Sequence, residues 1–406
     1  MIELLKTILW SSLGLFAFFY LSYYSLMVYE AKKPNNVQKQ RIFPKVSLVI
    51  PAHNEGKVIL RKLENVKNLD YPKEKLEVFV VDDGSTDNTC QVVQNFINQN
   101  AVEVQLELLV LPRWLGKASA LNYAWQCCNG EIIIISDADT TFEESAVTKI
   151  VQNFADSAVG AATGRLSVAS DSIESLSTKM EKSYRNIFDV LRIGESRIDS
   201  TPIFNGLLSA FRRELLDKLK PDTLADDTEL SLTIREKGWK AVYDPQAIAY
   251  EYPPDTLKLR VNQKLRRGRG IIQSFIRHRK MLFNPKYGKY GFVIFPSEFF
   301  MHVVSPILIL LITVLTLTTI ALTTPSSIIY FLLIAISLLV AYGLLSLVQR
   351  VVMPNKRVTI NPIAAIVTFV VHQIYLILSL FSLFIQRISG RWKKTEDIRT
   401  LWKTKE

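Results

Sequence analysis

The sequence predicts an α/β domain with a mostly parallel sheet, joined to membrane-spanning α-helices. Strand and helix patterns alternate over residues 46–136, which is typical of a parallel sheet with helices on both faces. Four consecutive isoleucines at residues 132–135 are too few for a helix and suit a central strand covered on both sides. Three segments without Asp, Glu, Lys or Arg, residues 7–29, 299–349 and 358–386, indicate membrane helices.

The uncharged segments set the expected number of membrane spans. A span needs about 20 apolar residues, so the first and third segments each hold one, and the middle segment can hold two that divide near Pro325. A cleaved signal peptide is the alternative for the first segment. Bulky residues follow its apolar part where a cleavage site needs small ones, which favours a permanent anchor.

The positions of the basic residues predict the orientation in the membrane. Lys and Arg flank the soluble region at both ends, which places it in the cytoplasm, at the cell membrane. One span before that region and three after it leave the basic tail, residues 387–406, on the outer side, although its charges favour the inner side. The sequence leaves this conflict open.

Charge and cysteine content narrow the class of protein. The 406 residues carry a formal charge of +11, and residues 256–297 contain many basic residues but no acidic ones. This stretch leads directly into apolar segments, and its amphipathic part, residues 256–283, favours an anionic bilayer surface over nucleic acid. Three cysteines are too few and too badly spaced for a disulfide framework or a zinc site, which fits a reducing compartment.

These patterns divide the chain into six parts. The expected parts are an N-terminal transmembrane helix (1–30), a linker (31–45), a cytoplasmic catalytic domain (46–255), basic amphipathic interface helices (256–297), about three C-terminal transmembrane helices (298–386) and a basic tail (387–406). Within the catalytic domain, strands are expected at 46–50, 77–81, 104–110 and 132–135. Three helices are expected: one that ends near residue 68, one that begins near residue 88 with Thr86 or Asp87 as its cap, and one that spans 117–128.

Acidic residues follow three of the expected strands. Glu55, Asp83 and the pair Asp137 and Asp139 each come shortly after a strand ends. Because the carboxyl ends of parallel strands meet at one edge of the sheet, these side chains are expected to converge. Two carboxylates one residue apart can hold Mg²⁺ or Mn²⁺ and leave positions open for phosphates. An Asp-rich turn is the alternative. The sequence has neither a G-x-G-x-x-G fingerprint after the first strand nor a Walker A motif, so metal and side chains would hold any phosphates.

Four ordered motifs resemble glycosyltransferase family 2. They lie at residues 46–55, 80–87, 116–122 and 137–139, and the resemblance extends over about residues 44–300. Members of this family are inverting enzymes with the GT-A nucleotide-sugar fold, so the resemblance implies that fold here.

The resemblance also implies roles for residues on the donor side. Asp83, near Asp82, would read the uracil or ribose of a UDP-sugar, and Lys117 would lie near the nucleotide. Asp137 and Asp139 would bind Mg²⁺ or Mn²⁺ on the diphosphate. Pro51 and Glu55 are implied as further donor-side residues.

Residues of the second half match the acceptor side of the family. Asn205 and Gly206 begin the segment that resembles the one running close to the acceptor sugar. Asp227 matches the family's general base, which removes the proton of the attacking hydroxyl. Asp226 would be its neighbour and could raise the pKa of the pair. The alternative is a helix start, with Asp226 or Asp227 as the cap and Glu229 in the first turn.

A further motif, at residues 263–267, departs from the pattern of the processive members. Those enzymes place Gln-x-x-Arg-Trp over the active site, and here Gln263 and Arg266 match while Arg267 replaces the tryptophan. All three are expected on the donor side, where arginine can contact the departing diphosphate. The substitution weakens the case for processive synthesis but not for transfer. A basic face against lipid phosphates is the alternative reading of these charges.

The sequence therefore predicts a membrane-bound inverting glycosyltransferase that moves a sugar from a UDP-sugar onto a growing polysaccharide at the cytoplasmic face. This version resembles the cellulose, hyaluronan and poly-N-acetylglucosamine synthases. One alternative is transfer of a single sugar to a lipid carrier such as a polyprenyl phosphate or a glycolipid. Another is a non-catalytic membrane scaffold that binds a sugar nucleotide. An accessory membrane subunit is compatible with all of these, and nucleic acid is not an expected partner.

Overall fold

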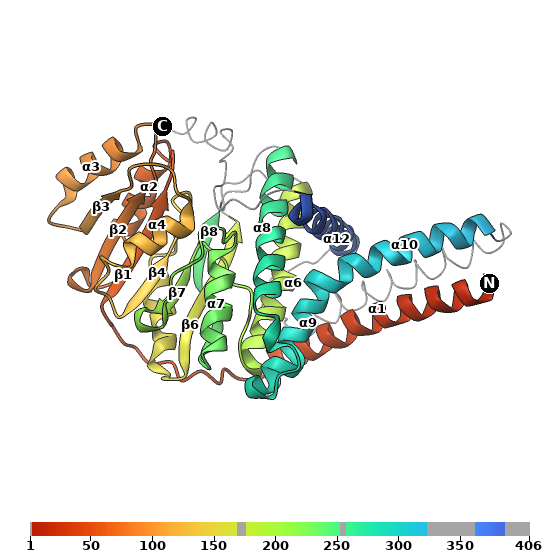
Figure 1. The fold of residues 1–406 in the computed structure, drawn as a ribbon. Coiled ribbons are helices and arrows are strands. Elements are labelled where there is room, and N and C mark those ends of the chain that lie inside the picture. The colour runs from red at the N-terminus through yellow and green to blue at the C-terminus, as the bar shows by residue number, and fades with distance from the viewer. Residues whose placement is uncertain (1, 169–175, 252–256, 323–361, 386–406) are drawn as a thin grey trace.

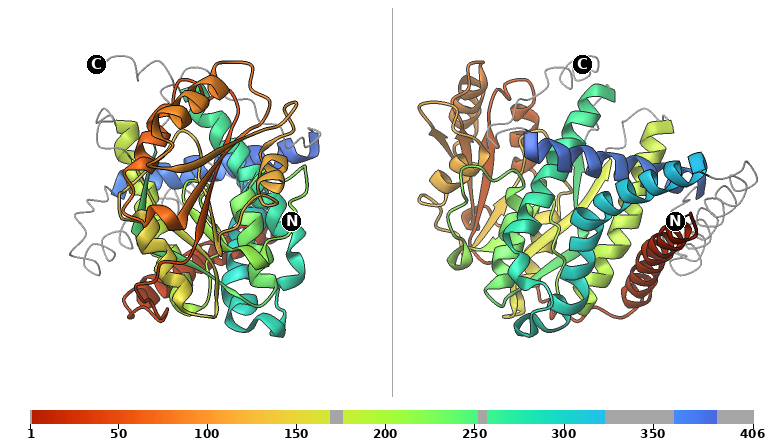
Figure 2. Two further views of the ribbon diagram at one scale, coloured as in Figure 1. Left: turned by 90° about the vertical axis from the view of Figure 1, so that its left-hand side faces the viewer. Right: turned by 45° about the vertical axis from the view of Figure 1, so that its right-hand side comes forward.

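The computed structural model describes residues 2–168, 176–251, 257–322 and 362–385 (Figure 1). The described part contains a sheet with helices on both faces, a group of long helices beside the last strands, and an arm formed by two helices (Figures 1 and 2). The N-terminus lies near the far end of the arm.

The described strands form one eight-stranded sheet in the order β3-β2-β1-β4-β7-β6-β8-β5. The strands are β1 (Val46–Ala52), β2 (Leu76–Asp82), β3 (Gln105–Val110), β4 (Ile132–Ile135), β5 (Thr141–Phe142), β6 (Val159–Val168), β7 (Ser209–Arg212) and β8 (Lys240–Glu251). The four strands expected from the sequence are all present.

The sheet is mixed, and only one part of it is fully parallel. The pairs β1·β2, β1·β4, β2·β3 and β6·β8 are parallel, whereas β4·β7, β6·β7 and β5·β8 are antiparallel. The parallel half is the region in which a helix follows each strand, as the alternating pattern indicated. The expectation of a mostly parallel sheet is thus confirmed in part: β6·β8 is also parallel, but β7 lies antiparallel between β4 and β6, and β5 lies antiparallel to β8.

Two apolar cores lie on the two faces of the sheet. In β4, Ile132 and Ile134 belong to one core, while Ile133 and Ile135 belong to the other, so the isoleucine run is buried on both sides. The helices that cover the first core are α2 (Ile59–Lys67), α3 (Thr89–Asn100) and α5 (Ala146–Val151), and those that cover the second are α4 (Lys117–Ala124) and α7 (Asp226–Glu236).

Several helix boundaries differ from those expected. The helix expected at 117–128 ends as α4 at Ala124, because the next residues form a turn in which the Cys127 N–H donates to the Ala124 carbonyl at 2.9 Å. The N-cap of α3 is Asn88, and Asp87 instead accepts a 3.0 Å bond from the Thr89 N–H.

At α7 the N-cap is Ala225, which provides no side-chain bond. Asp226 and Asp227 lie inside the first turn, so neither is the cap that the alternative interpretation of this segment expected, while Glu229 does lie in that turn.

A group of long helices lies beside the last strands of the sheet. It contains α6 (Leu176–Ile198), α8 (Leu257–Arg277) and α12 (Pro362–Ile385), with the short α9 (Phe295–Phe299) nearby (Figure 1). Ile271, Ile272 and Phe275 of α8 are buried in an apolar cluster with residues of α9 and α12. The apolar side of the basic stretch, which was expected to face a bilayer, is therefore covered by protein at these positions.

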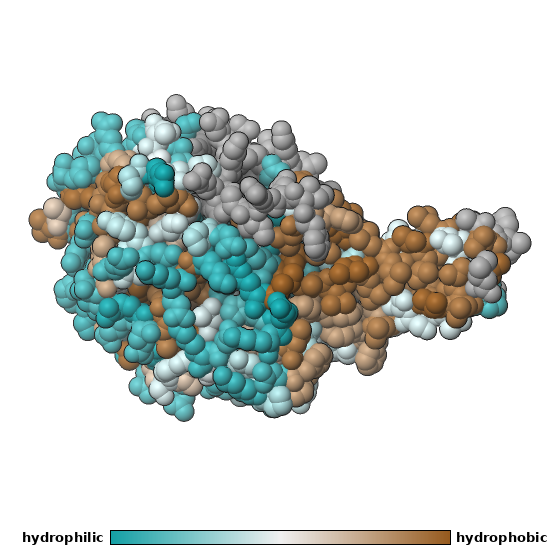
Figure 3. All heavy atoms as spheres, viewed as in Figure 1, coloured by the Kyte–Doolittle hydropathy of each residue, from teal (hydrophilic) through white to brown (hydrophobic). Residues whose placement is uncertain are grey.

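The arm consists of α1 (Ile2–Ala31) and α10 (Ser305–Leu322), which pack side by side (Figure 1). Two π-helical turns, η6 (Tyr290–Ile294) and η7 (Phe300–Val304), join α9 to its neighbours, so the chain is helical from Tyr290 into α10. Figure 3 shows that the arm is largely hydrophobic, and Phe18 on it is 70% exposed.

Two described helical segments, Ile2–Ala31 and Tyr290–Ile320, are long and apolar enough to cross a membrane. Helix α12 contains a shorter apolar segment, Phe369–Leu383. The second span expected within residues 299–349 and the basic tail at 387–406 lie outside the described residues, so the number of spans and the side of the tail remain predictions. All three cysteines are free thiols, in agreement with the sequence.

Candidate active site

The candidate site lies at the carboxyl edge of the parallel strands. Strand β1 pairs in parallel with β2 and with β4, with Ala52 opposite Asp82. The segments after these three strands therefore meet at one edge of the sheet, where α/β folds bind their ligands. Two hollows open there. Residues adjacent in the sequence of α7 and α8 line them, Asp226 and Arg266 in the first and Asp227 and Arg267 in the second.

The first hollow, called the donor hollow below, contains most of the residues expected to bind the donor. It encloses about 710 Å³, a volume that includes space open to solvent. Its walls are Pro51, Glu55, Lys117, Asp137, Ala138, Asp139, Thr223, Leu224, Asp226, Glu251, Gln263 and Arg266. Asp226, which was expected on the acceptor side, thus lines the donor hollow.

Lys117 connects the acidic residues of the donor hollow. Its Nζ lies 2.9 Å from Asp137 Oδ1 and 3.1 Å from Asp226 Oδ2. Burial disfavours the charged ammonium, but the two carboxylates outweigh it and raise the pKa of Lys117 above its usual value. The lysine therefore stays positively charged in the wall of the donor hollow.

The carboxylates of Asp137 and Asp139 fit a divalent cation. Burial, followed by the charges of Asp137 and Glu251, raises the pKa of Asp139 to about 7. Such crowding of oxygen ligands is relieved when a hard cation binds between them. In the described part of the chain, no group of three or more His, Cys, Asp or Glu side chains forms a preformed metal cage. The residues present suit an ion that shares its remaining positions with phosphate and water.

Glu251 at the end of β8 is a site residue that the sequence analysis missed. Its carboxylate accepts a 3.1 Å bond from Gln263 Nε2 and pairs at 2.9 Å with Arg185 of α6. Glu251 therefore connects α6 and α8 across the donor hollow. An acidic residue at the end of a strand would have indicated Glu251, but strand β8 was not among the strands expected from the sequence.

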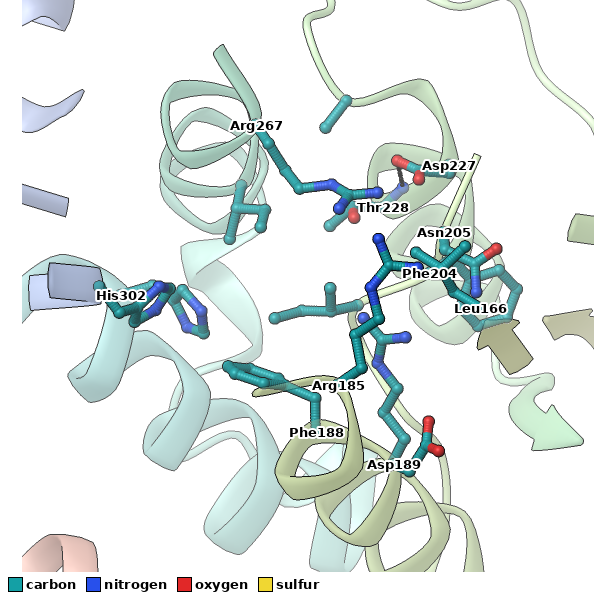
Figure 4. Close-up of a pocket in the computed structure, with 15 residues that line it drawn as sticks. Leu166, Arg185, Phe188, Asp189, Phe204, Asn205, Asp227, Thr228, Arg267 and His302 are labelled. Carbon is teal, nitrogen blue, oxygen red and sulfur yellow. Dashed lines mark hydrogen bonds between the residues drawn. The ribbon is translucent and has the colours of Figure 1, made fainter. Parts of the chain in front are cut away.

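The second hollow, called the acceptor hollow below, contains the expected base. It encloses about 700 Å³, including space open to solvent, and it reaches from Asp227 to His302 of η7 and His372 of α12 (Figure 4). Its walls are Leu166, Arg185, Phe188, Asp189, Arg192, Ile203, Phe204, Asn205, Ala225, Asp227, Thr228, Arg267, Ile271, His302 and His372. Arg267, which was expected on the donor side, lines this hollow instead and extends from α8 toward Asp227.

Gly206 lies between the two hollows. A Cβ atom at this position would lie 3.3 Å from Lys117 Nζ and 3.6 Å from both Asp137 Oδ2 and Asp227 Oδ2. The absence of a side chain thus keeps open the short path between the donor carboxylates and the base. The neighbouring Asn205 is buried and donates a 2.6 Å bond to the Gly164 carbonyl, so it holds this turn in place.

The environment of Asp227 suits a general base. Its Oδ1 accepts a 2.7 Å bond from the Thr228 N–H in the first turn of α7 (Figure 4). Burial and the neighbouring Asp226 raise the pKa of Asp227 to about 6, against the opposing charges of Lys117 and Arg267. A base with a pKa close to neutral is ionised at physiological pH and still holds a proton well.

Asp83 lies at the same sheet edge but outside both hollows. Its Oδ1 and Oδ2 accept 2.7 Å bonds from the backbone N–H groups of Leu115 and Gly116. The carboxylate thereby fixes the loop before α4, which packs closely on Gly84, a residue with a φ of +66°. Its contact with a nucleotide remains a prediction.

Two further features at this edge were not foreseen. Lys62 of α2 is fully buried, and its Nζ donates to Ser136 Oγ at 2.6 Å and lies over the Phe142 ring. Burial lowers the pKa of Lys62 to about 7, although Asp137 and Asp139 oppose this. The imidazole of His53 stacks on Trp114 at 4.9 Å. A lysine on a helix is ordinarily exposed, so no pattern in the sequence indicated that Lys62 is buried.

Comparison with known proteins gives consistent findings. The sequence profile described as glycosyltransferase like family 2 matches residues 44–270. The chain is 33% identical over 253 residues to the probable glycosyltransferase YdaM of Bacillus subtilis, and 28% identical over 273 residues to an N-acetylglucosaminyltransferase of Rhizobium sp. strain N33. These matches cover 60% and 64% of this chain, and the chain spans about three fifths of the length of these relatives (59% and 60%).

Among solved structures, a mannosyltransferase from Pyrobaculum calidifontis in complex with GDP-Man and Mn²⁺ superposes with a TM-score of 0.73 at 26% identity. The superposition covers 95% of this chain and 100% of the other. This similarity extends beyond the sheet to the helices that accompany it.

Proposed function

The chain belongs to glycosyltransferase family 2 and has the GT-A fold, and from this we propose that it is a membrane-bound inverting glycosyltransferase with Asp227 as its base. The observation that carries the proposal is the arrangement around Gly206. There the base of the acceptor hollow and the carboxylates of the donor hollow lie on either side of a position without a side chain. A nucleotide sugar and an acceptor could meet at this point with no protein group between them.

The chemistry follows from the residues on each side. Asp227 accepts the proton of the acceptor hydroxyl while that oxygen forms a bond to the anomeric carbon. The bond between the anomeric carbon and the diphosphate breaks from the opposite side, and the nucleoside diphosphate leaves. Lys117 and Arg266 hold positive charge in the donor hollow, where the leaving diphosphate needs it. Mg²⁺ or Mn²⁺ bound by Asp137 and Asp139 would add charge neutralisation at the same diphosphate.

The proposed donor is a UDP-sugar, with UDP-N-acetylglucosamine as the first candidate. The family resemblance supports uridine, and curated relatives such as the Rhizobium protein are named N-acetylglucosaminyltransferases. GDP-mannose is a second candidate, because the mannosyltransferase that matches nearly the whole chain was solved with GDP-Man and Mn²⁺. Radiolabelled UDP- and GDP-sugars, tested with and without Mn²⁺, decide between them. Transfer from GDP-mannose alone would overturn the uridine assignment.

The acceptor is proposed to be presented at the cytoplasmic face of the cell membrane. The two apolar helices and the basic residues that flank the soluble region support this location. The acceptor is either a growing polysaccharide or a lipid carrier that receives one sugar. Arg267 in the acceptor hollow, where the processive relatives have tryptophan, favours the lipid carrier. Product length separates the two versions, since a polymer gives a ladder and single transfer gives one added sugar.

Replacement of the base tests the assignment directly. Asp227→Asn removes the proton acceptor but keeps the shape, and we expect turnover to fall by about 10²–10⁴-fold with little change in donor affinity. Asp217→Asn is the matched control, because Asp217 is exposed and pairs only at the surface with Lys237. Unchanged turnover in Asp227→Asn would show that another group is the base. A wild-type protein that binds donors but transfers none would instead favour the scaffold alternative.

A further inference from the structure

Helix α2 contacts both ends of the acidic segment, residues 136–142, which carries Asp137 and Asp139 from β4 into β5. Lys62 of α2 forms a hydrogen bond with the first residue of this segment, and Asn65 of α2 forms two with the last. These two side chains are three positions apart, so they lie on the same face of the helix. One helix face therefore holds the acidic segment at its start and at its end.

The amine of Lys62 lies at the start of the segment. It is buried, at 1% exposure, and its Nζ donates a 2.6 Å bond to Ser136 Oγ. That hydroxyl lies 3.2 Å from Thr140 Oγ1, which in turn donates a 2.9 Å bond to the Asp137 carbonyl. A chain of hydrogen bonds thus connects α2 to the backbone of the first carboxylate residue.

The amide of Asn65 lies at the end of the segment. Its Nδ2 donates a 2.9 Å bond to the Phe142 carbonyl, and its Oδ1 accepts a 2.7 Å bond from the Phe142 N–H. The ring of Phe142 also contacts Lys62, whose Nζ lies 3.7 Å from the ring centroid. The two side chains of α2 therefore act on the segment together, from behind the donor hollow.

A buried amine fills this position at a cost. Burial lowers the pKa of Lys62 to about 7, against the charges of Asp137 and Asp139. An apolar side chain of similar length would fill the same space without losing hydration. What the lysine adds is the hydrogen bond to Ser136, and this bond acts on the acidic segment.

We propose that Lys62 and Asn65 are positioning residues, which hold Asp137 and Asp139 in the arrangement that binds a divalent cation. Neither of them lines the donor hollow, so each acts through the acidic segment. Replacement of groups that orient metal ligands from behind typically lowers metal affinity by about 10–100-fold. This role rests on the proposed function, because the cation is the Mg²⁺ or Mn²⁺ proposed for the donor hollow.

The test measures Mn²⁺ binding to the full chain in a neutral detergent, followed by the electron paramagnetic resonance signal of free Mn²⁺. Asn65→Leu removes the contact at the end of the segment, and Ser136→Ala removes the one at its start. We expect each to weaken Mn²⁺ binding by about tenfold. Asn65→Asp keeps an acceptor for the Phe142 N–H and should lose less than Asn65→Leu. Asp139→Asn removes a proposed ligand and identifies the ion bound in the donor hollow.

Lys62→Met is measured at pH 8, because a positive charge at this position would repel the cation. Above its pKa of about 7 most of the amine is neutral, but its N–H groups still donate to Ser136. The loss of position therefore outweighs the loss of repulsion, and Mn²⁺ binding should again weaken by about tenfold. The unfolding temperature should equal or exceed that of wild type, since methionine fills the space without a buried amine. Weaker binding at undiminished stability is a result that a purely structural role would not give.

Lys67→Met is the matched control on the same helix. Lys67 pairs with Glu103 at 2.9 Å and lies outside the donor hollow, so this variant should bind Mn²⁺ as the wild type does. Unchanged or tighter Mn²⁺ binding in Asn65→Leu and Lys62→Met would overturn the proposal. So would wild-type Mn²⁺ binding that does not depend on Asp139.

The proposed function is tested separately, by sugar transfer with the same preparations. If the wild type transfers no sugar but the variants weaken Mn²⁺ binding as expected, the function is refuted and the positioning role stands. Normal transfer with equal Mn²⁺ binding in all proteins would refute the positioning role alone. In a transferring enzyme, Asn65→Leu should raise the Mn²⁺ concentration for half-maximal turnover more than it lowers kcat at saturating Mn²⁺.

Discussion

Asp227 owes its expected reactivity to its immediate neighbours. Burial and Asp226 raise its pKa to about 6, while Lys117 and Arg267 act in the opposite direction. The same residues that tune the base therefore also line the two hollows, so a change in any of them should alter both binding and proton transfer.

This environment predicts how activity depends on pH. Because the base works only when ionised, turnover should be constant above pH 7 and fall about tenfold per pH unit below a midpoint near 6. Asp226→Asn removes a charge that raises the pKa and should move the midpoint to lower pH. A profile of kcat against pH checks both, and an unmoved midpoint in Asp226→Asn would contradict the assignment.

The raised pKa of Asp227 also makes the free energy of unfolding depend on pH. A folded-state pKa near 6, above the usual value of an aspartic acid, means that the folded state binds more protons than the unfolded state between about pH 4 and 6. The contribution of this carboxyl to stability therefore declines as pH rises through that window.

Gly206 gives a second prediction at the scale of one residue. Gly206→Val would place carbon atoms between Lys117, Asp137 and Asp227, where a single Cβ already lies within 3.6 Å of both aspartates. We expect turnover to fall by about a hundredfold, since small displacements of reacting groups cost that much. Gly206→Ala should lie between wild type and valine. Circular dichroism should show that all three proteins keep the fold. Equal turnover in the three would contradict the proposal that donor sugar and acceptor meet beside Gly206.

At the scale of elements, α8 holds the start of α7 in place. Arg277 lies 2.8 Å from Asp222 and 3.3 Å from Glu229, and Gln273 accepts a 3.1 Å bond from the Leu224 N–H. These contacts fix the segment that carries Asp226 and Asp227. Helix α8 thus supplies both Arg267 in the acceptor hollow and the support of the base.

Gly270 lies at the closest point of this contact. A Cβ there would approach Ala225 Cβ to 2.7 Å and Ala225 N to 2.9 Å, and backbone atoms cannot move aside without shifting α7. We expect Gly270→Ala to destabilise the protein by about 1–3 kcal/mol and to reduce turnover, because the base moves with the segment. Thermal unfolding and kinetics measure the two effects.

Gly14→Ala is the control for that substitution, since a Cβ at Gly14 meets nothing within 4 Å. It should leave the unfolding temperature and turnover close to those of wild type. A Gly270→Ala protein as stable and active as Gly14→Ala would show that the contact between α8 and α7 is not tight.

At the scale of the whole molecule, a polar body is joined to a hydrophobic arm (Figure 3). The acceptor hollow reaches from Asp227 of α7 to His302 of η7, which directly precedes α10 of the arm, and to His372 of α12. An acceptor that resides in a bilayer could therefore reach the base without leaving the hydrophobic phase entirely. This arrangement explains why one chain would contain both parts.

A matched pair of substitutions tests the role of the arm. Leu311 on α10 and Leu60 on α2 are similarly exposed, at 47% and 49%. Leu311→Asp should impair membrane insertion, because an aspartate in the middle of a span costs about 2.5–3.5 kcal/mol. Leu60→Asp should have no such effect. Recovery of each protein in carbonate-washed membranes measures insertion, and equal recovery would contradict a membrane-spanning arm.

The local elements and the residue types of the site could be predicted from the amino-acid sequence. The isoleucines of β4 and the acids that follow β1, β2 and β4 could be read directly, because hydrophobic period and strand ends are local properties. The order of the motifs then indicated the family, and the family implied Asp227 as the base. Arg266 lines the same hollow as Lys117, Asp137 and Asp139, and its role in binding the donor stays a prediction.

Only the tertiary structure decided which side chains share a space. In the structure, Arg267 lines the acceptor hollow and Asp226 lines the donor hollow. Arg185 pairs with Glu251, and the buried Lys62 donates a hydrogen bond to Ser136. The reason is physical: each of these contacts joins residues far apart in the chain, and packing of helices against the sheet sets their distances. No local pattern records such distances, so the two hollows could be seen only after the chain had folded.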